Sequence, residues 1–274
     1  MNDILNHPAV QSGVAPFVAA LIMALILGRV RLGGLAVAAA FGTAVYLISG
    51  FGFTPLSATR KIVLLGLAAP IAGVLVDFAF KPTRLGTVIL ALAGGAAAVW
   101  TFWSVLQQKS IAEALMLGGG AALFVAWLVG FSQSFLSSQP IRAGAAGLGL
   151  GIGVGVSAVL GASALYGQYG ISLGAAAGAF LLPQMIGGRK FEAGATFMLP
   201  LALTAGLLAA GTLILAQMRW YSLVALAFVP LAARLPAPEK SALWIQAVAI
   251  SACTLAAAAA AIALTWQSAG GQSG

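Results

Sequence analysis

Ionisable side chains are rare in this sequence, and Asp77 is the one best suited to chemistry. It lies in the segment PIAGVLVDFAFKPTR, one helical turn before Lys81. An ionised group costs about 2.5–3.5 kcal/mol at the centre of a membrane helix, so such groups usually have a function. Asp77 either pairs with Lys81 at the membrane surface or responds to protons or cations. Pro70 would assist the second role because it leaves a backbone carbonyl free for coordination.

The other acidic residues have the spacing of charge balance at helix ends. Glu113 follows Lys109 by four residues, which predicts an ion pair within one helix. Glu192 follows the pair Arg189 and Lys190, two residues after the lysine. No two carboxylates lie together in the sequence, so an acid–base pair for catalysis is not predicted.

Histidine and cysteine are too scarce to suggest catalysis or metal binding. His7 is the only histidine and lies near the N-terminus, so a histidine-based triad or metal centre between the helices would lack its base or ligand. Cys253 is the only cysteine and lies in an apolar run, where it is predicted to be a small packing residue. We therefore expect no metal and no cofactor, and an enzyme is the least favoured interpretation.

Prolines and one amide mark further places where a solute could meet polar groups. Gln184 follows Pro183, which interrupts backbone hydrogen bonding locally. Pro200 lies inside a later apolar run, as Pro70 does in an earlier one. The predicted path of a substrate or ion is therefore lined by Asp77, Gln184, Pro70 and Pro200. Alternatively, the polar side chains only join neighbouring helices.

Small residues recur every four positions in the stretch AGAAGLGLGIGVGVSAVLG. This spacing lets neighbouring helices approach closely. One predicted face carries Gly147, Gly151 and Gly155, and the other carries Gly149, Gly153, Ser157 and Gly161. We expect this helix to be central and tightly packed. Its faces either pack inside the chain, dock against another subunit, or let helices slide in a transporter.

The sequence that must position these residues is 61% apolar and only 7% charged, with a mean hydropathy of +1.06. Soluble domains carry about 25% charged residues, so water-soluble folds are excluded. A helix of about 20 apolar residues spans a bilayer. The apolar runs lie at about 11–28, 32–50, 62–80, 85–105, 111–131, 143–165, 170–187, 193–216, 220–234 and 241–266. We therefore predict an all-α polytopic integral membrane bundle of about ten helices, forming one domain over residues 1–274.

Two details of these runs carry their own expectations. The run at 220–234 is the weakest because it is short and contains Pro230. Tyr166, Gln168 and Tyr169 are predicted to form the outer connection between the sixth and seventh spans.

The 13 Lys and Arg residues occur singly or in pairs between the apolar runs, so they indicate topology and not a nucleic-acid surface. With the N-terminus outside, four of them lie outside and the remaining nine on the cytoplasmic side. The four are Arg60, Lys61, Lys109 and Arg219. We predict a bacterial cytoplasmic (inner) membrane protein with both termini outside. Its partners would be the lipid bilayer and a second copy or another membrane subunit.

Basic pairs and prolines recur at an interval near 130 residues. Arg60 and Pro70 in the first half correspond to Arg189 and Pro200 in the second, at offsets of 129 and 130. We interpret the interval as an inverted repeat of two five-helix halves, 11–131 and 143–266, an arrangement that builds many secondary transporters. Ten evenly spaced spans would also align at this interval without a duplication.

In size, number of spans and five-plus-five arrangement the chain resembles drug/metabolite-type transporters. The resemblance covers architecture alone, since no motif of that family is present and outward termini differ from its usual orientation. It implies a transporter fold with a solute site between the halves.

The favoured function is a small permease-like bundle for a neutral, amphipathic or lipid-like solute. Few interior charges argue against a proton pump or a selective ion channel. The alternative is a non-catalytic membrane subunit that acts as a scaffold through its glycine-rich faces. A permease predicts a cavity between the halves, whereas a scaffold predicts a filled interior and an outward glycine stripe.

Overall fold

The computed structural model describes residues 7–28, 32–79, 83–216, 218–237 and 241–270, and these residues form helices and turns without a β-strand. The helices are α2 (Ala15–Leu27), α3 (Ala36–Ile48), α4 (Ala58–Ala79), α5 (Arg84–Leu106), α6 (Ile111–Phe135), α7 (Pro140–Leu160), α8 (Ala164–Gly187), α9 (Gly194–Leu215), α10 (Trp220–Ala227), α11 (Val229–Ala232) and α12 (Leu243–Gly270). A π-helical turn, η1 (Val10–Val14), leads into α2, and a 3-10 turn, η3 (Gly33–Leu35), leads into α3.

Within the described residues, eight helices are long and apolar enough to cross a membrane, which supports the predicted multi-pass bundle. The runs predicted at 32–50 and 220–234 form shorter apolar helices, Gly33–Ile48 and Trp220–Ala232. In the second of these, α10 ends at Ala227 and α11 starts at Val229. Pro230 lacks the amide that would continue the helix, so it stands in the first turn of the new one.

The connection between α7 and α8 lies earlier than the sequence predicts. Helix α7 ends at Leu160, and Ala162 adopts a left-handed conformation with φ of 66°. An apolar alanine gives no sign in the sequence of such a backbone, which is costly for residues other than glycine. Tyr166 and Tyr169 therefore belong to the first turns of α8 and not to a loop.

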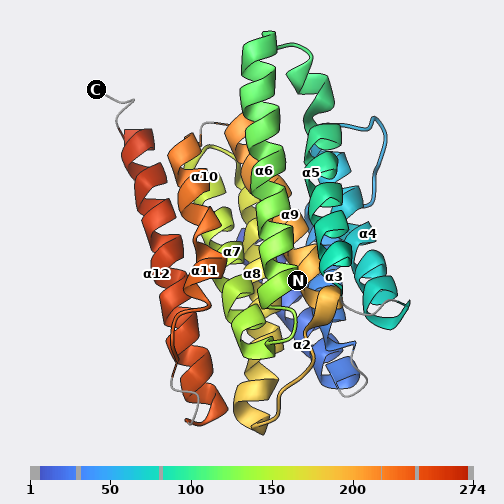
Figure 1. Ribbon diagram of the computed structural model, residues 1–274, viewed down its shortest axis with the longest axis vertical. Coiled ribbons are helices and arrows are strands. Elements are labelled where there is room, and N and C mark those ends of the chain that lie inside the picture. Colours follow the sequence, from blue (N-terminus) through green and yellow to red (C-terminus); the bar gives the residue numbers. More distant parts are fainter. Residues whose placement is uncertain (1–6, 29–31, 80–82, 217, 238–240, 271–274) are drawn as a thin grey trace.

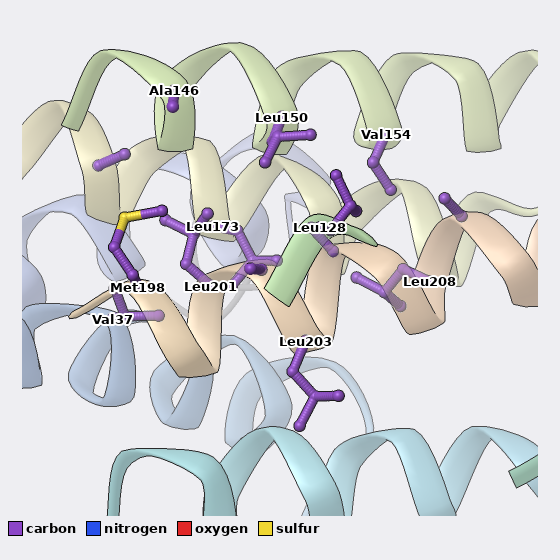
Figure 2. Packing of buried hydrophobic residues seen from close by; sticks show 14 of the residues in the cluster. Val37, Leu128, Ala146, Leu150, Val154, Leu173, Met198, Leu201, Leu203 and Leu208 are labelled. Atoms are coloured by element: carbon purple, nitrogen blue, oxygen red, sulfur yellow. The ribbon is translucent and has the colours of Figure 1, made fainter. Parts of the chain in front are cut away.

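Helix α9 is the centre of the bundle. Figure 1 shows the helices running roughly along the long axis, with α12 at one edge and α4 and α5 at the other. Helix α9 packs against α4, α6, α7 and α8 and is buried along most of its length. In Figure 2, Leu201 of α9 points toward α7 and Leu203 points to the opposite side. A helix that is apolar all round is expected in such a position.

Both small-residue faces of α7 contact helices of the same chain. Toward α8 and α9, Gly151 lies against the backbone of Gly174, Gly155 against Ile171, and Gly147 against Leu201 and Ala177. Toward α10, α11 and α12, Gly149 lies against Thr254 and Val229, and Gly153 against Leu226 and Ala258. Gly161, just after α7, lies against Thr212 at the end of α9 and against Met218. The backbones of α7 and α8 approach so closely that a methyl group at Gly151 would overlap the backbone nitrogen of Gly174.

The outer faces of the peripheral helices are apolar. Large side chains such as Ile22 of α2, Leu92 of α5 and Leu123 of α6 are mostly exposed. Apolar surface on this scale is typical of contact with lipid.

Glycine-to-alanine substitutions at two positions test how closely α7 and α8 pack. Gly151→Ala is expected to lower the free energy of unfolding by about 1–3 kcal/mol, since only backbone atoms lie in the way. Gly119→Ala in α6, where the added methyl group meets open space, is expected to be neutral or stabilising by up to about 1 kcal/mol. Unfolding midpoints of the purified variants in one detergent give the comparison. Equal midpoints for the two variants would contradict the close packing.

Candidate functional site

Asp77, near the end of α4, binds the first turn of α9. Its Oδ1 accepts a hydrogen bond of 2.7 Å from the amide of Ala195. Its Oδ2 accepts bonds from the amide and the hydroxyl of Thr196, at 2.7 and 2.6 Å. The carboxylate therefore caps α9 from another helix, next to the positive end of the helix dipole. Its predicted partner, Lys81, lies outside the described residues.

The start of α9 has the backbone that this cap requires. Gly194 has φ of 60°, and any side chain at this position would overlap the carboxylate of Asp77. The amide of Gly194 donates to the carbonyl of Ser137 at 2.9 Å, and the amide of Phe197 donates to Ala193. The amides of residues 194–197 are thus all hydrogen-bonded, although they lie where little water reaches.

Gln184 ties the connection between α8 and α9 (residues 188–193) to the end of α8. Its side chain is fully buried. Nε2 donates to the carbonyl of Phe180 at 2.8 Å, and Oε1 accepts from the amide of Phe191 at 3.0 Å. The ring of Phe191 lies against Gly28 at the end of α2. Gln184 and Asp77 therefore hold successive parts of one segment, the connection 188–193 and the helix start that follows it.

The two predicted prolines lie at the same level of the antiparallel pair formed by α4 and α9. The contacts on either side of the prolines join Gly66 to Thr204 and Gly73 to Thr196. Pro70 lies midway between Gly66 and Gly73 in α4, and Pro200 lies midway between Thr196 and Thr204 in α9. Both prolines are buried, so side chains fill the bundle at this level.

A cleft of about 320 Å³ opens at the opposite end of α4 from Asp77. The connection between α3 and α4 (residues 49–57) meets the first turns of α4 and α8 there, and we call it the α3–α4–α8 cleft. Its lining is Ser49, Gly50, Gly52, Pro55, Ser57, Thr59, Arg60, Val63, Leu165 and Tyr169. Sequence reasoning took Arg60 as a marker of topology and of the possible repeat, and did not single out Ser49, Ser57 or Thr59.

Two hydroxyl pairs hold the walls of this cleft together. Ser49 Oγ and Tyr169 OH are 2.8 Å apart, and Thr59 Oγ1 and Tyr166 OH are 3.0 Å apart. Tyr169 is fully buried, and its ring lies 5.5 Å from that of Phe41 in α3. The pairs connect the end of α3 and the start of α4 to α8.

Arg60 gives the cleft its charge. Its Nη1 donates to the carbonyl of Pro55 at 2.8 Å, and its side chain is half-buried. Next to it, Lys61 Nζ donates to the carbonyl of Trp100 at 3.0 Å and lies 4.8 Å from the centre of the Trp100 ring. None of the residues that line the cleft is acidic. The cleft can therefore hold a polar or anionic group, but it offers no pair of acid and base.

A second cleft of about 390 Å³ lies at the end of the bundle where α7 and α12 start. Arg142, Lys190 and Gln246 are among its lining residues. Nη1 of Arg142 donates to the carbonyls of Ala233 and Leu235 at 2.6 and 3.0 Å. This cleft and the α3–α4–α8 cleft therefore open at opposite ends of the bundle.

The ion pair predicted between Lys109 and Glu113 is not formed in the part of the chain that the structure describes. Ser110 caps α6 instead, and its hydroxyl oxygen accepts a bond of 3.4 Å from the Glu113 amide. Glu113 is exposed and lies in the first turn of α6, where a negative charge is favourable without a cationic partner.

The capping role of Asp77 can be separated from a role in a solute path. Asp77→Ala is expected to lower the free energy of unfolding by about 1–3 kcal/mol, because buried donors of α9 lose their acceptor. Glu113→Ala, which removes an exposed carboxylate in another first turn, is expected to have little effect. Thermal unfolding in detergent measures both. A variant at Asp77 with unchanged stability and lost solute uptake would identify the carboxylate as part of the path.

Comparison of the chain with protein-family models, with curated proteins and with solved structures found no match. The apolar helices themselves establish the class of the molecule: it is an all-helical, multi-pass membrane protein.

Proposed function

We propose that the chain is a permease-like bundle for a neutral, amphipathic or lipid-like solute. The observation that carries the proposal is the pair of clefts at opposite ends of the bundle, together with the buried α4–α9 contact at the level of Pro70 and Pro200. A solute that moved from the α3–α4–α8 cleft along α4 would meet this contact, which would act as a closed gate. Prolines leave backbone carbonyls without their helical donors, so a helix pair can bend at this level.

Helix packing in the core supports the inverted repeat. Counting α10 and α11 together as the ninth, the chain has ten spans in this proposal. The second span, α3, packs against the seventh, α8. The third span, α4, packs against the eighth, α9. Both pairings join a span to its counterpart in the other half, which a two-fold axis in the membrane plane allows. Other contacts lack a counterpart among the described residues: α12 packs against α7 but α6 not comparably against α2, and α6 packs against α9 but α12 not comparably against α4.

The scaffold alternative has less support. A scaffold that docks through the glycine faces of α7 needs at least one of them on the surface. Both are occupied by helices of the same chain, α8 and α9 on one side and α10 to α12 on the other. A partner subunit or a second copy would have to use another, lipid-facing surface.

Access to the α4–α9 contact tests the permease directly, without knowledge of the solute. Thr204 lies in this contact and is 1% exposed. In a Cys253→Ser background, Thr204→Cys is expected to react with a small water-soluble thiosulfonate, because a permease that opens to the two sides alternately exposes its gate to water. Thr254→Cys is the matched control, since Thr254 is equally buried between α12 and α7. Protection of both cysteines over hours would favour the scaffold.

For the orientation, we propose an inner-membrane location with both termini outside, so that the end carrying Asp77 faces the cytoplasm. Cysteines placed one at a time at Ser110 and Ser138, which lie at opposite ends of α6, report the two sides. Ser110→Cys is expected to react with an impermeant maleimide in intact cells, and Ser138→Cys only after permeabilisation. The reverse pattern would invert the topology.

A further inference from the structure

Among the described residues, the lining of the α3–α4–α8 cleft carries a positive charge and no negative one. Arg60 is half-buried, and within the described residues the carbonyl of Pro55 is the only acceptor that its guanidinium reaches. Asp77 and Glu192 lie at the other end of the bundle, and Glu113 lies at the start of α6, outside the lining of the cleft. A partly desolvated cation with no counter-charge favours an anion from outside the chain.

The geometry of Arg60 suits an anion with two or more oxygens. The bond to Pro55 fixes one edge of the guanidinium and leaves its remaining N–H donors for a ligand. Arginine presents such donors in a planar fork that matches carboxylate and phosphate groups. Ser57 adds a further donor at the same place: its oxygen accepts the amide of Arg60 at 3.4 Å, which leaves its own proton free.

Part of the lining of the cleft is apolar. Val63 of α4 and Leu165 of α8 also line it. A volume of about 320 Å³ is at the lower end of the range for ligand pockets. The cleft therefore has room for a head group and the first part of a chain, and not for a whole lipid.

We infer that the α3–α4–α8 cleft binds the anionic head group of an amphipathic molecule, with Arg60 and Ser57 contacting the head group and Val63 and Leu165 contacting the apolar part. This inference rests on the proposed function and narrows its solute class to anionic amphiphiles. The head group could belong to a membrane lipid or to a soluble amphiphile, and the two sources share the same chemistry.

Binding to the purified full-length chain in a neutral detergent tests the inference, with dodecyl phosphate as the probe and tryptophan fluorescence as the signal. Dodecyl phosphate is expected to bind saturably, and dodecyltrimethylammonium, with the same alkyl chain, at least 10-fold more weakly. Arg60→Gln is expected to weaken binding at least 10-fold, and Arg60→Lys less. The control Arg219→Gln removes an exposed charge at the same end of the bundle, outside the cleft, and is expected to leave binding unchanged.

Wild-type affinity in Arg60→Gln, or equal binding of the cationic amphiphile, would overturn the inference. Should Arg60→Gln fail to fold, Ser57→Ala in the exposed connection before α4 replaces it, with an expected loss of about threefold and the same consequence if the affinity is unchanged.

Two further measurements separate the sources of the head group. Displacement of dodecyl phosphate by millimolar inorganic phosphate would indicate that a free anion suffices. Displacement by nanodiscs containing phosphatidic acid, and not by nanodiscs of phosphatidylcholine alone, would indicate a lipid. Failure of both competitors would count against an anion site.

The outcome is independent of the gate experiment. If Thr204→Cys reacts but the chain does not bind the anionic head group, the anion site is refuted and the permease proposal stands. If the chain binds the head group but Thr204→Cys is protected, the permease proposal is refuted and the anion site stands.

Discussion

A membrane interior leaves no water for backbone amides, and the start of α9 shows how this chain meets that constraint. The helix begins inside the bundle, so its first amides need acceptors from the protein. Asp77 supplies both of its oxygens, and the carbonyl of Ser137 supplies a third acceptor. Because α9 packs against α4, α6, α7 and α8, this carboxylate helps to fix the start of the central helix of the bundle.

Close backbone approach is the second source of order. Between apolar helices in lipid there is little hydrophobic driving force, so association depends on van der Waals contact and interhelical hydrogen bonds. The α7–α8 contact uses glycine against glycine, and the α4–α9 contact uses Gly66 and Gly73 against the threonines of α9. The same features fill the interior, so the proposed permease would have to move α4 and α9 apart to let a solute pass between them.

The sequence predicts the class of the fold well because the length of an apolar run is a local property. Eight of the expected spans are long helices, and the ninth run, predicted to be the weakest because it is short and contains Pro230, is divided between α10 and α11. The predicted boundary between the sixth and seventh spans was wrong because the backbone turns at Ala162 in a left-handed conformation, and alanine is not a residue that indicates such a turn. The contacts of Asp77 with residues 195 and 196 were beyond prediction, since the helices that bring them together are separated by more than a hundred residues.

The cleft was hidden for the same reason. Arg60, Ser49 and Tyr169 come from three segments, and no spacing in the sequence relates them. The absence of a carboxylate near Arg60 is visible only when the neighbours are known. The one available signal of the cleft was the segment SATRK at 57–61, which is rich in hydroxyl and basic groups and lies at the start of an apolar helix.

The cap on α9 also bears on how the protein is assembled. Helices enter the bilayer in chain order, so the carboxylate of Asp77 is already in place when Gly194 leaves the ribosome. Helix α9 can then dock at once, and its polar start is never left bare in lipid. A circular permutant that placed α9 ahead of α4 would insert this helix without its acceptor, and α9 could dock only after α4 had been synthesised and inserted.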